Sequence, residues 1–253
     1  MDSIDRLAGE LDEWADAGLD AAFWWRDDDL GKPSPALGPL LALADDLALV
    51  PLLSVVPAWV SDDLPEQLSD FEVAVAVHGF NHVDHELGRA KKSEFGAFRN
   101  SEAVARDIVE GRARLKELFR DTPISCFVPP WNRMEHAHAA LLVDLGFTGL
   151  SMFGPSLNQP PISDICRINT HVDVIDWRSG RTFVGTPVMV QHLILQLRKR
   201  RRGELPLDEP IGLLSHHLEM SEPDWCKFGE VCETLVTHRA ARMLDSRQIW
   251  EFC

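Results

Sequence analysis

The stretch FWWRDDDLGKPSP, residues 23–35, runs from an apolar, aromatic segment typical of a buried strand into three consecutive aspartates. Adjacent carboxylates repel one another, so a fold that gathers three of them must compensate their charge. In isolation the triplet is typical of a solvated turn in which one aspartate caps the next element. A bound divalent cation would compensate the same charge, and the rest of the sequence decides between the two interpretations.

Strand and helix patterns alternate along the chain from this stretch. Short apolar runs predict about seven strands, at residues 21–25, 52–56, 72–77, 124–128, 148–152, 165–169 together with 171–175, and 211–215. Periodic apolar positions predict helices at residues 3–17, 35–47, 64–68, 102–119, 137–145, 188–201 and 225–237. Such alternation implies parallel strands with helices outside, in either a closed barrel or an open doubly wound sheet. We expect a single domain over residues 1–253.

The composition limits the partners of the protein. Its 253 residues carry 40 acidic and 25 basic side chains, for a formal net charge of −15. This balance argues against nucleic acid and anionic membranes, which select basic surfaces. No apolar run reaches membrane-spanning length, and no secretory signal precedes the first helix. Five scattered cysteines are expected to be reduced thiols, so the sequence predicts a cytoplasmic protein and leaves its oligomeric state open.

Polar side chains follow several predicted strands at their carboxyl ends. They are Asp27, Asp28 and Asp29 after the first strand, His78 after the third, Trp131, Asn132 and Arg133 after the fourth, Asp173 and Asp176 at the end of the sixth, and His216 and His217 after the last. In parallel α/β barrels these ends converge on the face that holds the active site. We therefore expect these side chains to share one site.

His78 and His82 are four residues apart in the segment HGFNH. On one helical turn this spacing places both imidazoles on the same side. Two neutral imidazoles and a carboxylate, with one position left for water, form a common catalytic zinc site. A pair of hydrogen-bonded loop histidines would explain the spacing by itself, but the nearby aspartates favour a metal.

These residues resemble the five ordered motifs of the polysaccharide deacetylase superfamily of carbohydrate esterases. The first motif, Thr-Phe-Asp-Asp-Gly, corresponds to WRDDD at residues 25–29, and the second, His-[Ser/Thr]-x-x-His, to HGFNH at residues 78–82. The third, Arg-x-Pro-[Tyr/Trp], corresponds to VPPW at residues 128–131. The fourth, centred on Asp-Trp, corresponds to DVIDW at residues 173–177, and the fifth, Leu-x-His, to LSH at residues 214–216.

The resemblance implies a distorted (β/α)₇ barrel and a metal-dependent hydrolase. Such an enzyme would remove acetyl groups from an N-acetylated, or O-acetylated, sugar or saccharide precursor. Carried over by motif position, Asp28, His78 and His82 would bind the metal, for which Zn²⁺ is the expected ion.

The resemblance also implies the catalytic groups. Asp27 would be the general base and His216 the general acid, and the backbone N–H of Trp131 would help hold the oxyanion. Asp176 would orient one of these groups, as carboxylates behind an active site do.

Two positions depart from the family pattern. Val128 stands where the family has an arginine that pairs with the base, and Asp29 stands where the first motif has glycine. Arg26 or Arg133 would be close enough in sequence to replace the missing arginine.

The expected substrate contacts are Pro130, Trp131, Arg133 and His217. His217 directly follows His216, so either could be the acid, and motif position favours His216. Two alternative functions also fit the sequence. One is an amidohydrolase acting on another C–N amide substrate, and the other is a catalytically weakened glycan-binding protein, which the missing arginine suggests.

Overall fold

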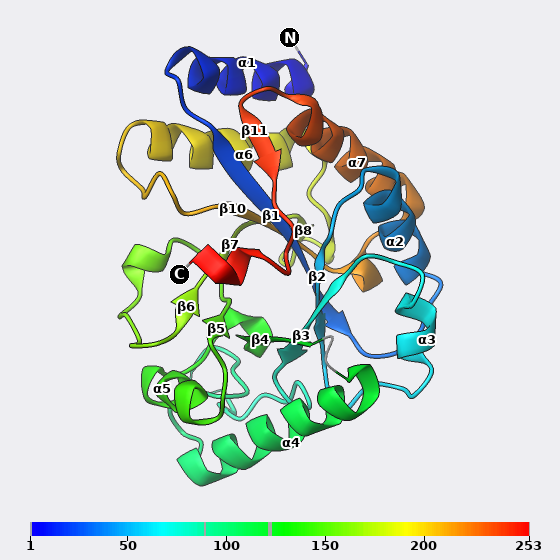
Figure 1. Cartoon of the computed structure of the whole chain (residues 1–253), viewed down its shortest axis with the longest axis vertical. Helices are drawn as coiled ribbons and strands as arrows, with labels where there is room; N and C mark the ends of the chain where they lie inside the picture. Colours follow the sequence, from blue (N-terminus) through cyan, green and yellow to red (C-terminus); the bar gives the residue numbers. More distant parts are fainter. Residues whose placement is uncertain (1, 89, 121–122, 253) are drawn as a thin grey trace.

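A curled parallel β-sheet forms the centre of the computed structural model, which describes residues 2–88, 90–120 and 123–252 (Figure 1). The strands lie in the order β6-β5-β4-β3-β2-β1-β10-β7, and a short strand, β11, pairs with the start of β1. Their bounds are β1 (Ala21–Leu30), β2 (Leu52–Val55), β3 (Ala74–His78), β4 (Pro123–Val128), β5 (Gly149–Leu150), β6 (Cys166–Arg167), β7 (Thr170–Asp173), β10 (Ile211–Ser215) and β11 (Ala241–Met243). Neighbouring strands in this sheet pair in parallel.

The segment that follows β5 meets β7 and closes the curl. Phe153 forms an isolated parallel bridge with Thr170. The N–H of Gly154 donates to the carbonyl of Thr170 at 2.8 Å, and the N–H of Thr170 donates to the carbonyl of Met152 at 3.0 Å. The expected distorted (β/α)₇ barrel is therefore confirmed, in place of an open doubly wound sheet.

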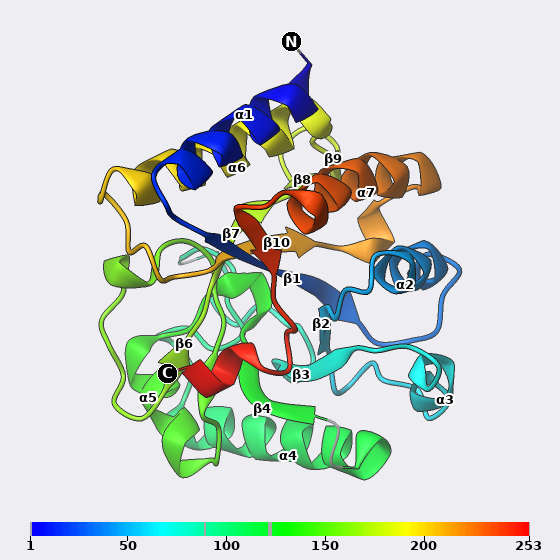
Figure 2. The ribbon, with the colours of Figure 1, turned by 45° about the horizontal axis from the view of Figure 1, so that its top comes forward.

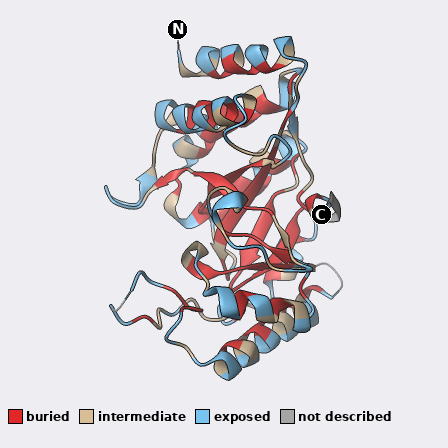
Figure 3. Cartoon of the chain, turned by 90° about the vertical axis from the view of Figure 1, so that its left-hand side faces the viewer, coloured by how far each residue is buried: buried red, intermediate tan, exposed pale blue. Residues whose placement is uncertain are grey.

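Helices cover the outside of the barrel (Figure 2). They are α1 (Ser3–Asp16), α2 (Leu37–Asp46), α3 (Leu64–Leu68), α4 (Ser101–Phe119), α5 (His136–Asp144), α6 (Thr186–Arg201) and α7 (Glu222–Thr237). A capping box between Asp2 and Asp5 starts α1, which packs on α6 and α7. The strands and the inner sides of the helices are buried, and the outer sides of the helices are exposed (Figure 3).

Alternate residues of β1 enter two different apolar clusters, as the two faces of a strand do. Trp24 joins the small cluster inside the barrel, which includes Cys126, and Trp250 packs edge-on against it with ring centroids 6.1 Å apart. Trp25 joins the larger cluster between the sheet and the helices, where its ring lies 5.1 Å from that of Phe228 in α7. The same alternation decides which of the following polar residues can face the barrel interior.

β1 extends five residues beyond the predicted strand and contains all three aspartates. The extension forms because Asp27 pairs with Ser215 of β10 on one side and with Leu53 of β2 on the other. The sequence also did not predict β11 or the antiparallel hairpin of β8 (Ile175–Asp176) and β9 (Thr182–Phe183). Four short 3₁₀ segments complete the elements within the described residues: η1 (Pro130–Asn132), η2 (Ser156–Asn158), η3 (His217–Glu219) and η4 (Ile249–Phe252).

Among the described residues, no helix combines the length and apolar character needed to cross a membrane. Cys126, Cys226 and Cys232 are free thiols, as expected. Cys166 is disulfide-bonded, so the expectation of a reduced thiol is wrong for this residue. Cys253 lies outside the described residues.

Candidate active site

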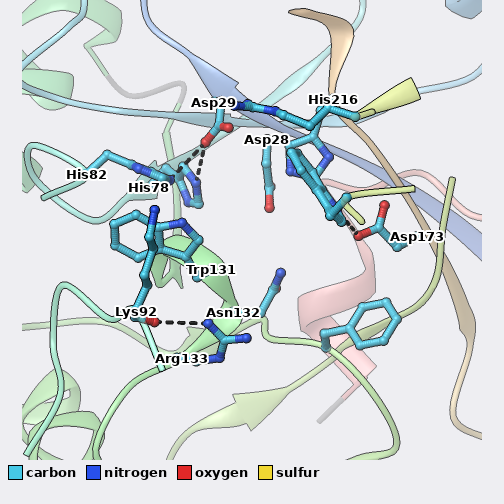
Figure 4. A pocket seen from close by; sticks show the side chains of 13 residues that line it. Asp28, Asp29, His78, His82, Lys92, Trp131, Asn132, Arg133, Asp173 and His216 are labelled. Carbon is cyan, nitrogen blue, oxygen red and sulfur yellow. Dashed lines mark hydrogen bonds and ion pairs between the residues drawn. The ribbon is translucent and has the colours of Figure 1, made fainter. Parts of the chain in front are cut away.

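A cavity of about 590 Å³ opens at the carboxyl ends of the strands (Figure 4). Its walls include six residues that received a predicted role: Asp28, His78, His82, Trp131, Arg133 and His216. They also include Asp29, Asn132 and Asp173, which we expected to share the site without a defined role, and four further side chains, Lys92, Phe153, Trp177 and Arg181. Four predicted residues are not part of this wall: Asp27, Pro130, Asp176 and His217.

The end of β1 brings two consecutive carboxylates, Asp28 and Asp29, into the same cavity. Regular alternation would send them to opposite faces. The pairing of β1 with β2 shifts register between Asp27 and Leu30, and Asp29 adopts a left-handed backbone with φ of 70°. Aspartate is among the residues that tolerate this conformation best. The irregularity turns the Asp29 carboxylate toward the side that Asp28 already faces.

Asp29, His78 and His82 form a candidate metal site. Oδ1 of Asp29 lies 3.1 Å from Nε2 of each histidine, and the ligand atoms of the three residues all lie within 4.8 Å of one another. Figure 4 shows both imidazoles directed at this carboxylate. The geometry therefore differs from the expectation that Asp28 joins the histidines, and favours Asp29.

The chemistry of this donor set fits a metal ion such as Zn²⁺. Nδ1 of His78 lies 2.9 Å from the carbonyl of Val128, which can only accept, so Nδ1 carries the proton. In the neutral ring Nε2 then presents its lone pair to the site. Burial opposes the charged form of Asp29, but hydrogen bonds from both histidines outweigh it and hold the pKa of Asp29 below its ordinary value. Burial likewise opposes the charged form of His78, but the Asp28 charge and the Asp29 bond raise its pKa.

A loop, not a helical turn, brings the two histidines together. His78 ends β3, and Gly79 and His82 both have left-handed backbones, with φ of 61° and 56°. The buried carboxylate of Glu94 accepts backbone N–H groups from Phe80 (3.3 Å), Asn81 (2.8 Å) and His82 (3.2 Å). A Cβ at position 79 would lie 2.3 Å from Glu94 Oε2, so this position requires glycine. Glu94 thus shapes the loop that carries His82.

The sequence did not identify Glu94, which lies in the charged segment at residues 91–99. A single acidic residue among basic ones gave no sign that it would be buried. Burial raises the pKa of Glu94 despite the opposing hydrogen bonds.

Arg26 lies on the same face of β1 as Asp28 and contacts it directly. Nη2 of Arg26 donates to Oδ2 of Asp28 at 3.0 Å, and Nε lies 2.9 Å from Oδ1. The guanidinium is fully buried and also donates to Ser151 Oγ at 2.7 Å and to Asn132 Oδ1 at 2.5 Å. Burial raises the pKa of Asp28, but the charges of Arg26 and then His78 lower it by more, so the net shift is downward.

His216 and Asp173 occupy the wall opposite the histidine pair (Figure 4). His216 lies between β10 and η3, and its ring meets the edge of Trp177 with centroids 4.6 Å apart. Its Nδ1 is buried without a hydrogen-bond partner among the described residues. Asp173 accepts the Trp177 indole N–H at 2.7 Å, and burial raises its pKa despite the His216 charge and these hydrogen bonds.

Asp27 and His217 form a separate buried pair on the other face of β1. Nδ1 of His217 lies 2.5 Å from Oδ1 of Asp27, and Ser215 Oγ donates to Oδ2 of Asp27 at 2.6 Å. Trp25 Nε1 in turn donates to Ser215 at 2.8 Å. Strand alternation explains why Asp27 faces away from the cavity, where we expected it to act as the base.

Asp176 and Pro130 also lie away from their expected positions. Oδ1 of Asp176 accepts the N–H groups of Arg178 and Ser179, both at 3.0 Å, and so shapes the β8–β9 turn. Pro130 is buried in η1, where its ring packs close to Gly79. These contacts give both residues a local structural role, and Asp173 takes the place in the cavity that we expected for Asp176.

Comparison with known proteins rests on structure alone, because no family model and no curated protein matches the sequence. A family 4 carbohydrate esterase from Streptomyces lividans, solved with acetate, is 16% identical and superposes with a TM-score of 0.59, covering 91% of this chain and 95% of that one. This chain has the family 4 esterase fold. An acetyl xylan esterase of family 4 from Clostridium thermocellum, solved with a cobalt ion, is 13% identical, with a TM-score of 0.56 over 88% of this chain and 87% of that one.

The family 4 fold also includes proteins without activity. A pseudoenzyme from Bacillus anthracis is 12% identical and superposes with a TM-score of 0.58, covering 88% of this chain and 63% of that one. A mutant of that protein has restored enzymatic activity. Individual site residues, and not the fold, therefore decide whether a chain of this fold is active.

Proposed function

We propose that this protein is a metal-dependent hydrolase that removes acetyl groups from an acetylated sugar or saccharide precursor. The observation that supports this most is the convergence on one cavity of a metal-ligand set, a carboxylate paired with an arginine, and a histidine with an unpartnered nitrogen. Acetate in the Streptomyces lividans structure and cobalt in that from Clostridium thermocellum agree with this chemistry.

Asp29, His78 and His82 would hold the metal, for which we propose Zn²⁺. Bound there, the ion would polarise the acetyl carbonyl and make a water molecule more acidic. The roles inferred from the motifs thus move by one residue along β1, because Asp29 and not Asp28 faces the two histidines.

Asp28 would accept the proton of the attacking water. Arg26 keeps this carboxylate ionised and fixes its orientation, which a base requires. His216, in its protonated form, would donate a proton to the leaving nitrogen or oxygen from the opposite wall. Asp173 would stabilise positive charge on His216. The backbone N–H of Trp131, a cavity residue in η1 with a left-handed φ of 55°, would support the oxyanion.

Arg26 also bears on the alternative functions. A weakened, glycan-binding role was suggested by the missing arginine of the third motif, and Arg26 supplies a guanidinium beside the carboxylate from β1 instead. This observation favours a hydrolase. An amidohydrolase acting on another C–N amide would use the same groups, so the acyl group has to be identified by assay.

The test is acetate release by purified, Zn²⁺-loaded protein from a panel of N- and O-acetylated sugars, with and without a chelator. We expect release that the chelator abolishes and added Zn²⁺ restores. No release across the panel from metal-loaded protein, or release that survives complete metal removal, would contradict the proposal.

A further inference from the structure

Two cations at the rim of the cavity, Lys92 and Arg133, lack an acidic partner. Within the described residues, no carboxylate oxygen lies within 4.0 Å of a side-chain nitrogen of either one. Nη1 of Arg133 donates to the carbonyl of Lys92 at 3.0 Å, and Ser93 Oγ donates to the carbonyl of Arg133 at 3.0 Å. These bonds tie the two segments together, and both side chains border the same opening (Figure 4).

Asp84, a carboxylate in the same loop as Lys92, is engaged by backbone groups. Its Oδ1 accepts the backbone N–H groups of Glu86 at 3.0 Å and of Ser93 at 3.2 Å. Asp84 therefore shapes the loop that presents Lys92. These backbone bonds and then the charge of Lys92 lower the pKa of Asp84, but the two side chains make no ion pair within 4.0 Å.

Three arginines elsewhere in the chain illustrate the alternative, a cation paired with a carboxylate. In the basic end of α6, Arg198 and Arg201 both bind the buried Glu10, at 2.7 and 2.8 Å. At the cavity itself, Arg181 binds Glu219 at 2.5 Å. Lys92 and Arg133 lack such a carboxylate, and an anionic group of the substrate would supply the missing negative charge.

We propose that the acetylated substrate carries an anionic group, a carboxylate or a phosphate, which Lys92 and Arg133 bind at the rim. This inference rests on the proposed hydrolase function and specifies its substrate class. A guanidinium and an ammonium each bind both kinds of oxyanion.

The charges that line the cavity indicate where the acetyl group and the anionic group of the substrate would bind. Asp28 and Asp29 line the cavity between His216 and the other two histidines, and their negative charge would repel an anion there. The neutral acetyl group fits beside these carboxylates, and the anion belongs at the rim. The ring of Trp131 packs on His82 with centroids 4.3 Å apart, and in Figure 4 it lies between the histidines and Arg133. Its indole would therefore lie alongside the sugar that connects the two groups.

The test compares matched substrates on the Zn²⁺-loaded enzyme. One pair is N-acetylglucosamine and its 1-phosphate, and the other is an N-acetylated uronic acid and its methyl ester, so the two pairs separate phosphate from carboxylate. We expect at least one anion to be preferred in KM by roughly tenfold or more, as charge-assisted hydrogen bonds allow. The preference should shrink at high salt.

The double variant Lys92→Gln/Arg133→Gln should bring the ratio of anionic to neutral KM values close to one. Lys227→Gln, which removes an exposed cation on α7, is the matched control and should leave the ratio unchanged. Equal KM values within both pairs for the parent enzyme, or a preference that survives the double variant, would overturn the inference.

A binding measurement tests this inference independently of the proposed hydrolase function. Titration calorimetry of the same sugar pairs on an Asp28→Asn variant measures rim recognition without turnover. The anionic sugars should bind more tightly than the neutral ones, and adding Lys92→Gln and Arg133→Gln to the Asp28→Asn variant should abolish the difference. This result would support binding of the anion by Lys92 and Arg133 even where no acetate is released. If acetate is released but the two sugars of each pair bind equally, the hydrolase function is supported and anion binding by Lys92 and Arg133 is ruled out.

Discussion

Arg26 and Asp28 face the same side of β1, and Nη2 of Arg26 donates a hydrogen bond to Oδ2 of Asp28 at 3.0 Å. This contact supplies from the first strand the guanidinium that the third motif lacks at Val128. Arg133, the other residue considered as a replacement, instead binds the carbonyl of Lys92 at the rim. The relationship between Arg26 and Asp28 can be tested through the pH dependence of the reaction.

Replacing Arg26 by glutamine should lower kcat/KM and shift the acidic limb of the pH profile of kcat/KM to higher pH. Asp28 must be ionised to accept a proton, and the Arg26 charge holds its pKa down against burial. Without that charge the pKa of Asp28 rises, so a higher pH is needed to ionise it. We expect a loss of roughly 10–100-fold, as for other residues that position a catalytic group.

The comparison uses neutral acetylated sugar and metal-loaded enzymes. Arg133→Gln is the control, since it removes a cavity arginine that does not contact Asp28, and its acidic limb should stay in place. An unchanged acidic limb in Arg26→Gln would show that Asp28 is not the group that titrates.

Asp28→Asn and Asp29→Asn should separate two roles that adjacent residues play. Losing a residue that only hydrogen-bonds to a metal ligand lowers metal affinity by roughly 10–100-fold. Asp29→Asn should lower Zn²⁺ affinity by more than this, because it removes the charge of a ligand itself. Asp28→Asn should retain the metal and lose turnover. The measurement is metal content after dialysis against a graded chelator, together with acetate release. Loss of metal from Asp28→Asn alone would restore the assignment that the motif alignment implies.

Much of the barrel could be predicted because its strands are continuous apolar runs, such as the one at residues 74–77 that leads to His78. The sequence also indicated which strand ends carry chemistry. It could not indicate which of residues 27–29 enters the cavity, because a register shift and the positive φ of Asp29 decide this. The register shift lies in the pairing of β1 with β2, a strand that begins only at Leu52, so it depends on a contact distant in the sequence.

Other misplaced residues have similar causes. Asp173 and Asp176 both lie at the end of a predicted strand, but the unpredicted hairpin of β8 and β9 uses Asp176 in its turn. Glu94 is isolated in a charged segment, and only the path of the loop from His78 to His82 shows why it is buried. The cytoplasmic location and the single domain stay predictions.

Glu94→Ala should weaken metal binding without touching a metal ligand. The Glu94 carboxylate accepts N–H groups from the loop that carries His82, and its removal leaves them unpaired. We expect a loss of about 1–3 kcal/mol in the free energy of unfolding and a lower Zn²⁺ affinity. Glu94→Gln keeps one oxygen acceptor and should fall between alanine and the parent. Chemical denaturation and competition with a zinc indicator measure the two effects, and unchanged Zn²⁺ affinity in Glu94→Ala would rule out this positioning role.

His216→Gln should reduce turnover and His217→Gln should reduce stability, although the two residues are adjacent. His216 lines the cavity, so His216→Gln should lose turnover and keep its stability. His217 is buried against Asp27, and its loss leaves that carboxylate without its charged partner, at a cost of about 3–5 kcal/mol in unfolding free energy.

The pH dependence of this cost has a definite sign. Burial opposes the charged form of His217, but Asp27 outweighs it and raises the pKa of His217 above the ordinary value of 6.5. The stabilisation from the charged pair is therefore fully present below pH 6.5 and is lost as the pH rises through the higher pKa of the folded state. Urea unfolding of the parent and of His217→Gln across this range should show their difference shrinking as the pH increases. A difference that grows with pH would mean that the pair is not an imidazolium–carboxylate pair, and lost turnover in His217→Gln with unchanged stability would make His217 the better candidate for the acid.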